Sequence, residues 1–186
     1  MAVTDNSTLK GFFNTGDKPT ETNFATLVDS CINTDTTVSN ATSADVNLTS
    51  VTSSHKLFLT GTFAADVLLP QADANNIGIT ISIFCTVATA ASGTIRLGFA
   101  DSGSTVIAGN IHVFSTTADQ GMSIVVPASS KTIHLDSDAA DHAGGAEGSE
   151  YHFHYYGANL VYLTGRGVTT NSDPALDSNV ASGTGI

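Results

Sequence analysis

Apolar and polar residues alternate along most of the chain, in short segments bounded by Gly, Asn, Asp, Ser or Pro. In the clearest segment, 77–87, every second residue is Ile, Cys or Val, and Gly, Thr, Ser and Phe lie between them. Alternation with a period of two predicts a strand with one face in a core. Many such strands without helical patterns between them predict a mainly β domain over 46–165, an antiparallel β-sandwich or jelly roll.

One segment near the N-terminus has a helical pattern instead. In GDKPTETNFATLVDSCINT, residues 16–34, large apolar residues recur at the spacing of a helix with one buried face. These residues are Phe24, Leu27, Val28, Cys31 and Ile32. Thr20 is the expected N-cap, and Glu21 places a negative charge in the first turn, where the helix dipole favours it. The sequence therefore predicts one short amphipathic helix over 16–34.

Three further segments lack a regular pattern. Residues 1–15 form a polar arm that ends in the apolar pair Phe12 and Phe13. Residues 35–45 are rich in Ser and Thr and are expected to be a linker. Residues 166–186 have few large apolar side chains and are expected to be a tail that is disordered or laid across a neighbour.

Charge narrows the possible partners. The 186 residues include 6 Lys and Arg against 17 Asp and Glu, which gives a formal net charge of -11. Nucleic-acid binding depends on cations that displace phosphate counterions, so we expect no nucleic-acid partner. No segment approaches the ~20 apolar residues of a membrane span, so no membrane association is expected. Only 12% of the residues are charged, about half the usual share. The resulting hydroxyl-rich surface suits packing against a protein partner.

Reactive side chains occur without a recognisable catalytic arrangement. Cys31 and Cys85 lie within apolar patterns and are expected to be small buried hydrophobes. No G-x-S-x-G motif or phosphate-binding loop is found, and Arg166 is expected to form an ordinary surface ion pair. The sequence predicts no catalytic residues, no cofactor and no enzymatic activity.

His152 and His154 are two residues apart in EYHFHYYG, so a strand places both on one face. Tyr156 follows on that face, and the core face is expected to hold Tyr151, Phe153 and Tyr155. Two imidazoles could begin a zinc or nickel site, with a third ligand from His112, His134 or His142. The favoured interpretation is that the pair faces solvent or makes contacts between subunits, and no metal site is predicted.

An acidic, Gly-rich loop lies between two predicted strands. Residues 136–150 carry Asp136, Asp138, Asp141, Glu147 and Glu150. Their oxygens could collect around calcium, but their order is not that of an EF-hand loop. A solvated acidic loop is the favoured interpretation, and calcium binding stays open.

A resemblance adds to these patterns. Residues 9–33, LKGFFNTGDKPTETNFATLVDSCIN, resemble a segment found near the N-terminus of many virion proteins of tailed phages, especially marine phages. In that family an aromatic-containing stretch precedes G-D-K-P-T and an amphipathic helix. Residues 69–109 look like the strand-rich domains of the same class, in which a Leu-Pro turn precedes a strand and a Gly-rich hairpin follows.

The resemblance implies a virion structural protein. A compact β domain without fibrous repeats suits a capsid decoration, or cement, protein on the outer capsid surface. Such a protein would form a homotrimer and bridge neighbouring capsomers, with the major capsid protein as its partner. The expected assembly anchors are the apolar residues of the N-terminal segment: Phe12, Phe13, Phe24, Leu27 and Val28.

Two alternatives remain open at this point. One is a short tail-fibre or adaptor subunit, again trimeric. The other is a carbohydrate-binding module for host attachment that uses exposed aromatic residues, for which Tyr155, Tyr156 and Tyr162 are the candidates.

Overall fold

The computed structural model describes most of the β region and three residues before it. The described residues are 20, 22–23, 37–41, 45–61, 66–88, 95–117, 120–135, 144–170 and 181–186. The chain divides into two units, Met1–Thr36 and Thr37–Ile186. The expected anchors Phe12, Phe13, Phe24, Leu27 and Val28 lie outside the described residues, as does most of the expected helix.

The described part of the N-terminal unit contains a capping arrangement. The Thr20 hydroxyl oxygen accepts a hydrogen bond of 3.2 Å from the backbone N–H of Asn23. The Asn23 side-chain oxygen accepts a bond of 2.8 Å from the backbone N–H of Thr20. Reciprocal bonds of this kind satisfy free N–H groups at a helix start, and Thr22 and Asn23 have helical geometry. Thr20 thus has the hydrogen bonds of an N-cap.

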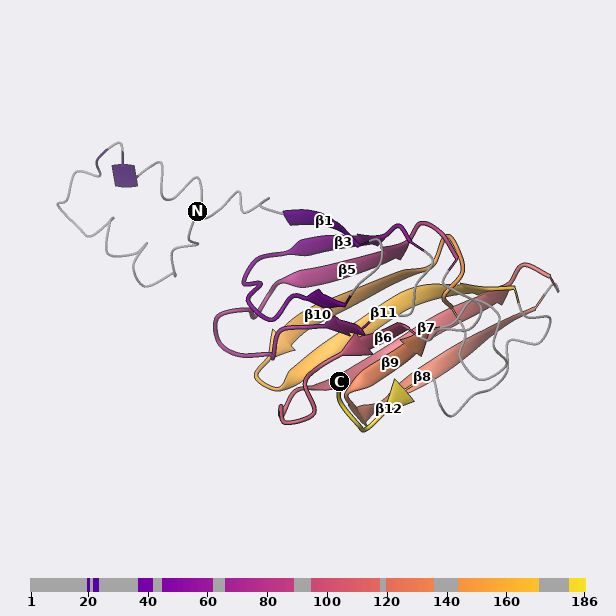
Figure 1. Ribbon diagram of the computed structural model, residues 1–186. Helices are drawn as coiled ribbons and strands as arrows, with labels where there is room; N and C mark the ends of the chain where they lie inside the picture. The colour runs from indigo at the N-terminus through magenta and orange to yellow at the C-terminus, as the bar shows by residue number, and fades with distance from the viewer. Residues whose placement is uncertain are drawn as a thin grey trace. The chain divides into compact units, whose positions relative to one another are not determined.

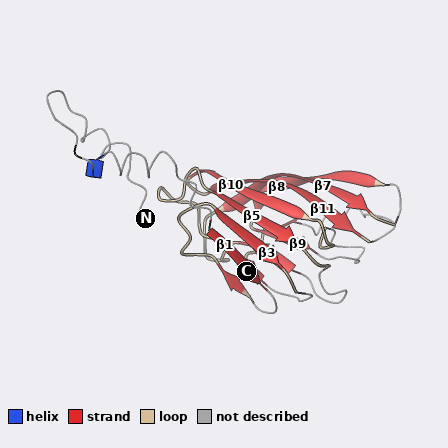
Figure 2. Ribbon diagram, turned by 90° about the horizontal axis from the view of Figure 1, so that it is seen from above, coloured by secondary structure: helices blue, strands red, loops and turns tan. Residues whose placement is uncertain are grey.

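The β unit is built from strands and connecting loops (Figure 2). The described strands are β1 (Thr37–Ala41), β2 (Val46–Asn47), β3 (His55–Leu59), β4 (Asp66–Leu68), β5 (Thr80–Cys85), β6 (Ile95–Gly98), β7 (Val106–Ser115), β8 (Gly121–Ser130), β9 (Thr132–Leu135), β10 (Glu150–Gly157), β11 (Leu160–Thr169) and β12 (Ala181–Ser182). The mainly β prediction is confirmed.

The strands form two mixed sheets (Figure 1). The larger sheet has the order β1-β3-β5-β10-β11-β7-β8, and the smaller has the order β12-β9-β6-β4-β2. From β1 to β6 the chain alternates between the sheets, so β1, β3 and β5 run parallel in one and β2, β4 and β6 run parallel in the other. Parallel neighbours need a crossover connection, and here the crossover passes through the opposite sheet. The expected purely antiparallel pairing is therefore wrong.

Later strands complete the larger sheet with hairpins. β7 and β8 pair antiparallel, and so do β10 and β11. The β10–β11 hairpin lies between β5 and β7, which makes β10 the central strand of seven (Figure 1).

One core cluster draws side chains from both sheets. Tyr151, Phe153 and Tyr155 of β10 are buried in it, as are Leu97 of β6 and Ile133 of β9. Burial of this apolar area, at roughly 25 cal/mol per Å², is the main favourable contribution to folding. The strand predicted most clearly, β5, contributes Ile81, Ile83 and Cys85 as its alternation requires.

The segments predicted as linker and tail contain strands. β1 lies within the expected linker 35–45, and β12 lies within the expected tail 166–186, where β11 also continues to Thr169. Ala41 is the one buried residue of β1, so a period-two apolar pattern is missing there. These two strands lie at sheet edges and are held by backbone pairing, β1 with β3 and β12 with β9.

Candidate functional site on the outer face of the seven-stranded sheet

The central strand β10 shows how the larger sheet obtains two different faces. Tyr151, Phe153 and Tyr155 point into the core, with at most 1% of each residue exposed. Successive side chains of a strand point to opposite faces, so His152, His154 and Tyr156 lie on the outer face. This is the arrangement that the alternation in EYHFHYYG predicts.

Six rings form an aromatic track across the outer face. Phe58 and Phe84 have ring centroids 5.0 Å apart, and Phe84 and His152 are 6.0 Å apart. The track continues from His152 to His154 at 6.3 Å, from His154 to Tyr156 at 6.3 Å, and from Tyr156 to Tyr162 at 6.2 Å. The strands β3, β5, β10 and β11 supply these rings, so segments distant in the sequence build one surface.

Large apolar side chains are exposed at one end of the track. Tyr156 is 70% exposed, Leu160 is 40% exposed and Tyr162 is 39% exposed. We call these three residues the tyrosine patch. Ile77 is also exposed. It lies in a turn beside this end of β10, because the Gly78 N–H donates a hydrogen bond to the Tyr155 carbonyl oxygen.

The outer face carries little charge. Strand register places the cations Lys56 and Arg166 on this face. Glu150 is the one carboxylate that the described strands of the larger sheet place there. The whole chain has a formal charge of -11. Among the described residues, the strands of this face therefore carry two cations and one carboxylate.

His152 and His154 are held by hydroxyl groups of the same chain. His152 Nδ1 lies 2.9 Å from Ser82 Oγ, and His154 lies 3.1 Å from Thr80 Oγ1 and 3.3 Å from Thr164 Oγ1. Burial, and secondarily the neighbouring His152, lowers the pKa of His154 below its ordinary value of 6.5. Each ring thus has a defined orientation on the central strand.

Neither of the two candidate third ligands that the structure describes joins this pair. His112 lies on β7, and His134 lies on β9 of the other sheet, whereas His142 lies outside the described residues. Among the described residues, no group of three or more His, Cys, Asp or Glu side chains could hold a metal ion.

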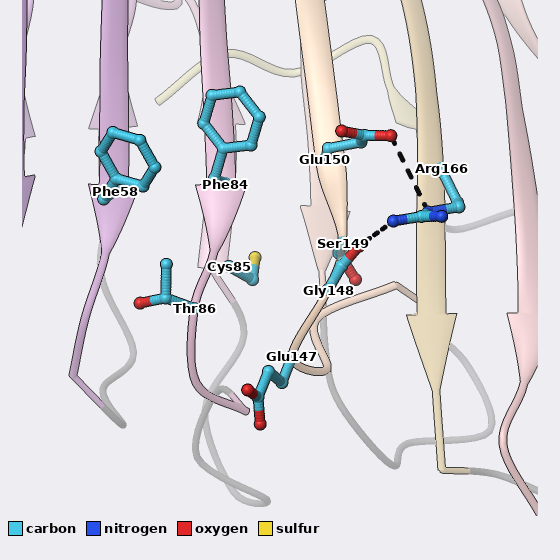
Figure 3. Close-up of a pocket in the computed structure, with 9 residues that line it drawn as sticks. All are labelled: Phe58, Phe84, Cys85, Thr86, Glu147, Gly148, Ser149, Glu150 and Arg166. Carbon is cyan, nitrogen blue, oxygen red and sulfur yellow. Dashed lines mark hydrogen bonds and ion pairs between the residues drawn. The ribbon is translucent and has the colours of Figure 1, made fainter.

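A cleft opens at the other end of the track. Its volume is about 340 Å³, and its lining includes Phe58, Phe84, Glu147, Glu150 and Arg166. We call it the phenylalanine cleft. Figure 3 shows the two phenylalanine rings side by side on neighbouring strands, with the carboxylates and the guanidinium beyond them. Phe58 and Phe84 are cross-strand partners, and so are Phe84 and Glu150, because β3, β5 and β10 are in register there.

An ion pair crosses β10 and β11 at the edge of the cleft (Figure 3). Arg166 Nε lies 3.8 Å from Glu150 Oε1, and the Arg166 guanidinium also donates a 3.1 Å hydrogen bond to the Gly148 carbonyl oxygen. The Arg166 side chain is 53% exposed and that of Glu150 is 37% exposed. The expected surface ion pair of Arg166 is confirmed.

The smaller sheet presents a different outer surface. Arg96 Nε donates a 2.7 Å hydrogen bond to Asp66, and this bond raises the pKa of Arg96. Asp66 and Arg96 are cross-strand partners on β4 and β6, and His134 of β9 is the next neighbour of Arg96. This region is polar and charged, in contrast to the aromatic track.

The sequence predictions for this region have mixed outcomes. Tyr155 is wrong as an exposed sugar-binding residue, because it is buried and donates a 3.0 Å hydrogen bond to the Pro70 carbonyl oxygen. Cys85 is a buried free thiol, as expected. Glu147 and Glu150 border the cleft, while Asp136, Asp138 and Asp141 lie outside the described residues. Phe58, Phe84 and the cleft are the features that the sequence analysis missed.

Comparisons with known proteins leave the site to be interpreted from its own geometry. No protein-family description, no curated protein and no solved structure matches this chain. In the part of the chain that the structure describes, no helix has the length and apolar character required to cross a membrane.

Proposed function

We propose that this chain is a structural protein of a tailed-phage virion, namely a capsid decoration protein that forms a homotrimer and bridges neighbouring capsomers. The resemblance of residues 9–33 to virion proteins supports the class. The division of the chain at Thr36 and Thr37 supports separate roles for its two parts. In this proposal the N-terminal unit attaches to the major capsid protein and the β unit makes contacts between copies.

The observation that carries the proposal is the exposed tyrosine patch on a face with little charge. Tyr156, Leu160 and Tyr162 expose apolar area at the end of the central hairpin, and contiguous exposed apolar area is typical of a contact surface. A second copy of the chain also has a formal charge of -11. Electrostatic repulsion between two copies is therefore smallest where they meet through a surface with few carboxylates, such as this face. These facts favour another copy of the same chain as the partner.

The anchors of the N-terminal unit belong to the same proposal. Phe12, Phe13, Phe24, Leu27 and Val28 would bury apolar area against the shell, at roughly 25 cal/mol per Å² less the cost of ordering the segment. His152 and His154 lie next to the tyrosine patch on β10 and would border the contact between copies. Repeated weak contacts over a particle then add through multivalency.

The fold class fits such a protein. Two mixed sheets around one core support the β-sandwich prediction in its broader form, with the chain wound around the core from β1 to β6. Decoration requires a rigid β unit that presents one face in a fixed orientation, and a shared core provides this rigidity.

Mass measurement in solution tests the self-association. The wild-type chain is expected to be a trimer, and the double variant Tyr156→Ser with Tyr162→Ser is expected to be a monomer with an unchanged circular dichroism spectrum. The matched control is Val38→Ser, which changes an exposed residue of the edge strand β1, three strands away from β10, and should stay trimeric. A monomeric wild-type protein would contradict the proposal.

Particle binding tests the attachment. Removal of residues 1–33 should abolish binding to capsids and leave the oligomeric state of the β unit unchanged. Labelled protein on intact particles should lie on the head, whereas labelling at the tail would favour the tail-fibre or adaptor alternative. Binding that survives the removal would show that the N-terminal segment is not the anchor.

A further inference from the structure

We propose that the phenylalanine cleft is a binding site for a neutral saccharide. The cleft combines an apolar aromatic surface with a carboxylate and a guanidinium at its edge. Ligand sites in proteins are typically concave, largely apolar and equipped with a few polar groups that orient the ligand. The volume of about 340 Å³ is at the lower end of the range for such sites and suits one or two sugar rings.

The aromatic surface comes from Phe58 and Phe84. Their planes differ by 18° and their centroids are 5.0 Å apart, so the two rings stack against each other across the neighbouring strands β3 and β5, and both line the cleft. The His152 ring packs edge-on against Phe84, with ring centroids 6.0 Å apart and an interplanar angle of 77°. This contact limits the movement of the Phe84 ring. A pyranose ring has an apolar face of C–H groups, which can pack against the parts of these stacked rings that line the cleft and remove apolar area from water.

The polar groups match the hydroxyls of a sugar. A hydroxyl both donates and accepts hydrogen bonds, so two adjacent hydroxyls can bond a carboxylate and a guanidinium at the same time. Glu150 and Arg166 are cross-strand partners at a separation of 3.8 Å. Both are partly exposed, so ligand hydroxyls can replace water around them. Bonds to ionised groups are about twice as strong as bonds between neutral groups.

The charges of the cleft disfavour two other ligand classes. An anion would meet Glu147 and Glu150 with Arg166 as the only cation among the described lining residues, so repulsion is expected. A divalent metal ion requires several oxygen ligands, and the described residues gather no suitable group of three. A neutral polyhydroxylated ligand uses both the aromatic and the polar groups.

The cleft is separate from the tyrosine patch. Glu150 and Tyr156 are six residues apart on β10, which corresponds to about 20 Å at roughly 3.3 Å per residue. Contacts between copies that are centred on the tyrosine patch therefore leave the cleft open to a ligand. Sugar binding and self-association can be measured independently, and either result can fail without the other.

Calorimetric titration of the full chain with neutral oligosaccharides tests the proposal. The panel contains oligomers of glucose, galactose, mannose and N-acetylglucosamine, with choline as an organic-cation probe. At least one oligosaccharide should bind below about 10 mM. Glu150→Gln, which keeps the side-chain shape, and Phe84→Ala should each weaken binding at least about tenfold. Tyr156→Ala, at the other end of β10, should leave the affinity unchanged.

Each other outcome would overturn the assignment. If no oligosaccharide of the panel binds at about 10 mM, the cleft is not a neutral-saccharide site. Binding of choline in place of sugars would assign the cleft to organic cations held by the rings and carboxylates. Sugar binding that is unaffected by Glu150→Gln and by Phe84→Ala would place the sugar site elsewhere on the protein. The oligomeric state of each variant, measured in parallel, separates this result from a failure of the proposed trimer.

Discussion

The hydroxyl group of Tyr155, on the central strand of the larger sheet, donates a 3.0 Å hydrogen bond to the backbone carbonyl oxygen of Pro70. Pro70 follows β4 of the smaller sheet, so the bond connects the two sheets inside the core. Both residues are buried, and burial raises the pKa of Tyr155, which keeps the phenol protonated as a donor.

Removal of this hydroxyl should destabilise the β unit. Tyr155→Phe keeps the ring but leaves the Pro70 carbonyl without this partner, at an expected cost of about 1 to 3 kcal/mol in the free energy of unfolding. Tyr156→Phe is the matched control, because Tyr156 is 70% exposed, and its cost should be below about 0.5 kcal/mol. Urea unfolding of the two variants measures the difference, and equal values would show that the buried bond contributes nothing.

A glycine at the junction of β7 and β11 should not tolerate a side chain. Gly109 has a φ angle of 152°, and a Cβ atom there would lie 1.9 Å from the Leu163 carbonyl oxygen. Because that atom belongs to the paired backbone, Gly109→Ala should force the strands apart and cost at least about 3 kcal/mol. At Gly157 a Cβ atom would meet no heavy atom within 4 Å, so Gly157→Ala should cost less than about 1 kcal/mol. Thermal unfolding of both variants compares them.

The thiol of Cys85 should be unreactive in the folded protein. Only 2% of the residue is exposed, and burial raises the pKa of the thiol from 9.0 to about 12. This rise lowers the thiolate fraction near neutral pH by about a thousandfold. In a Cys31→Ser variant, alkylation by iodoacetamide should therefore be slow in buffer and rapid in urea. Rapid alkylation with an intact circular dichroism spectrum would contradict the buried position.

The sequence pattern was most informative where one face of a strand is buried. Alternation placed Tyr151 and Phe153 of β10 in the core and His152 on the other face, and the structure agrees. The pattern carries no information on the direction in which a strand pairs, so the parallel neighbours β3 and β5 were not foreseen. β1 was missed because the ladder with β3, and not an apolar stripe, defines it.

The cleft could not be predicted for a related reason. Phe58, Phe84 and Glu150 come from three strands, and only the register of β3, β5 and β10 brings them together. Register between distant segments depends on the packing of the whole core. A large aromatic residue at a position that alternates with the core face, such as the half-buried Phe84 beside the buried Ile83, is the one local signal that could have drawn attention to the site.

Acidification should destabilise the β unit through two histidines. Burial lowers the pKa of His55, and burial together with His152 lowers the pKa of His154, each from 6.5. His55 also has a buried Nδ1 atom that has no hydrogen-bond partner in the structure, so a proton on this atom would be poorly accommodated. Because the unfolded chain titrates near 6.5, it binds more protons than the folded chain between that value and the lowered folded pKa.

Stability should therefore be constant well above pH 6.5, fall as the pH decreases through this value, and level off below the folded pKa. Urea unfolding at about pH 8 and about pH 5 measures the change. His154→Gln keeps a polar group beside Thr80 and Thr164, and His55→Gln keeps one beside Ser39. Each variant should lose part of the pH dependence, since glutamine does not titrate. If both variants kept the full pH dependence of the wild-type protein, the acid sensitivity would have to come from other groups.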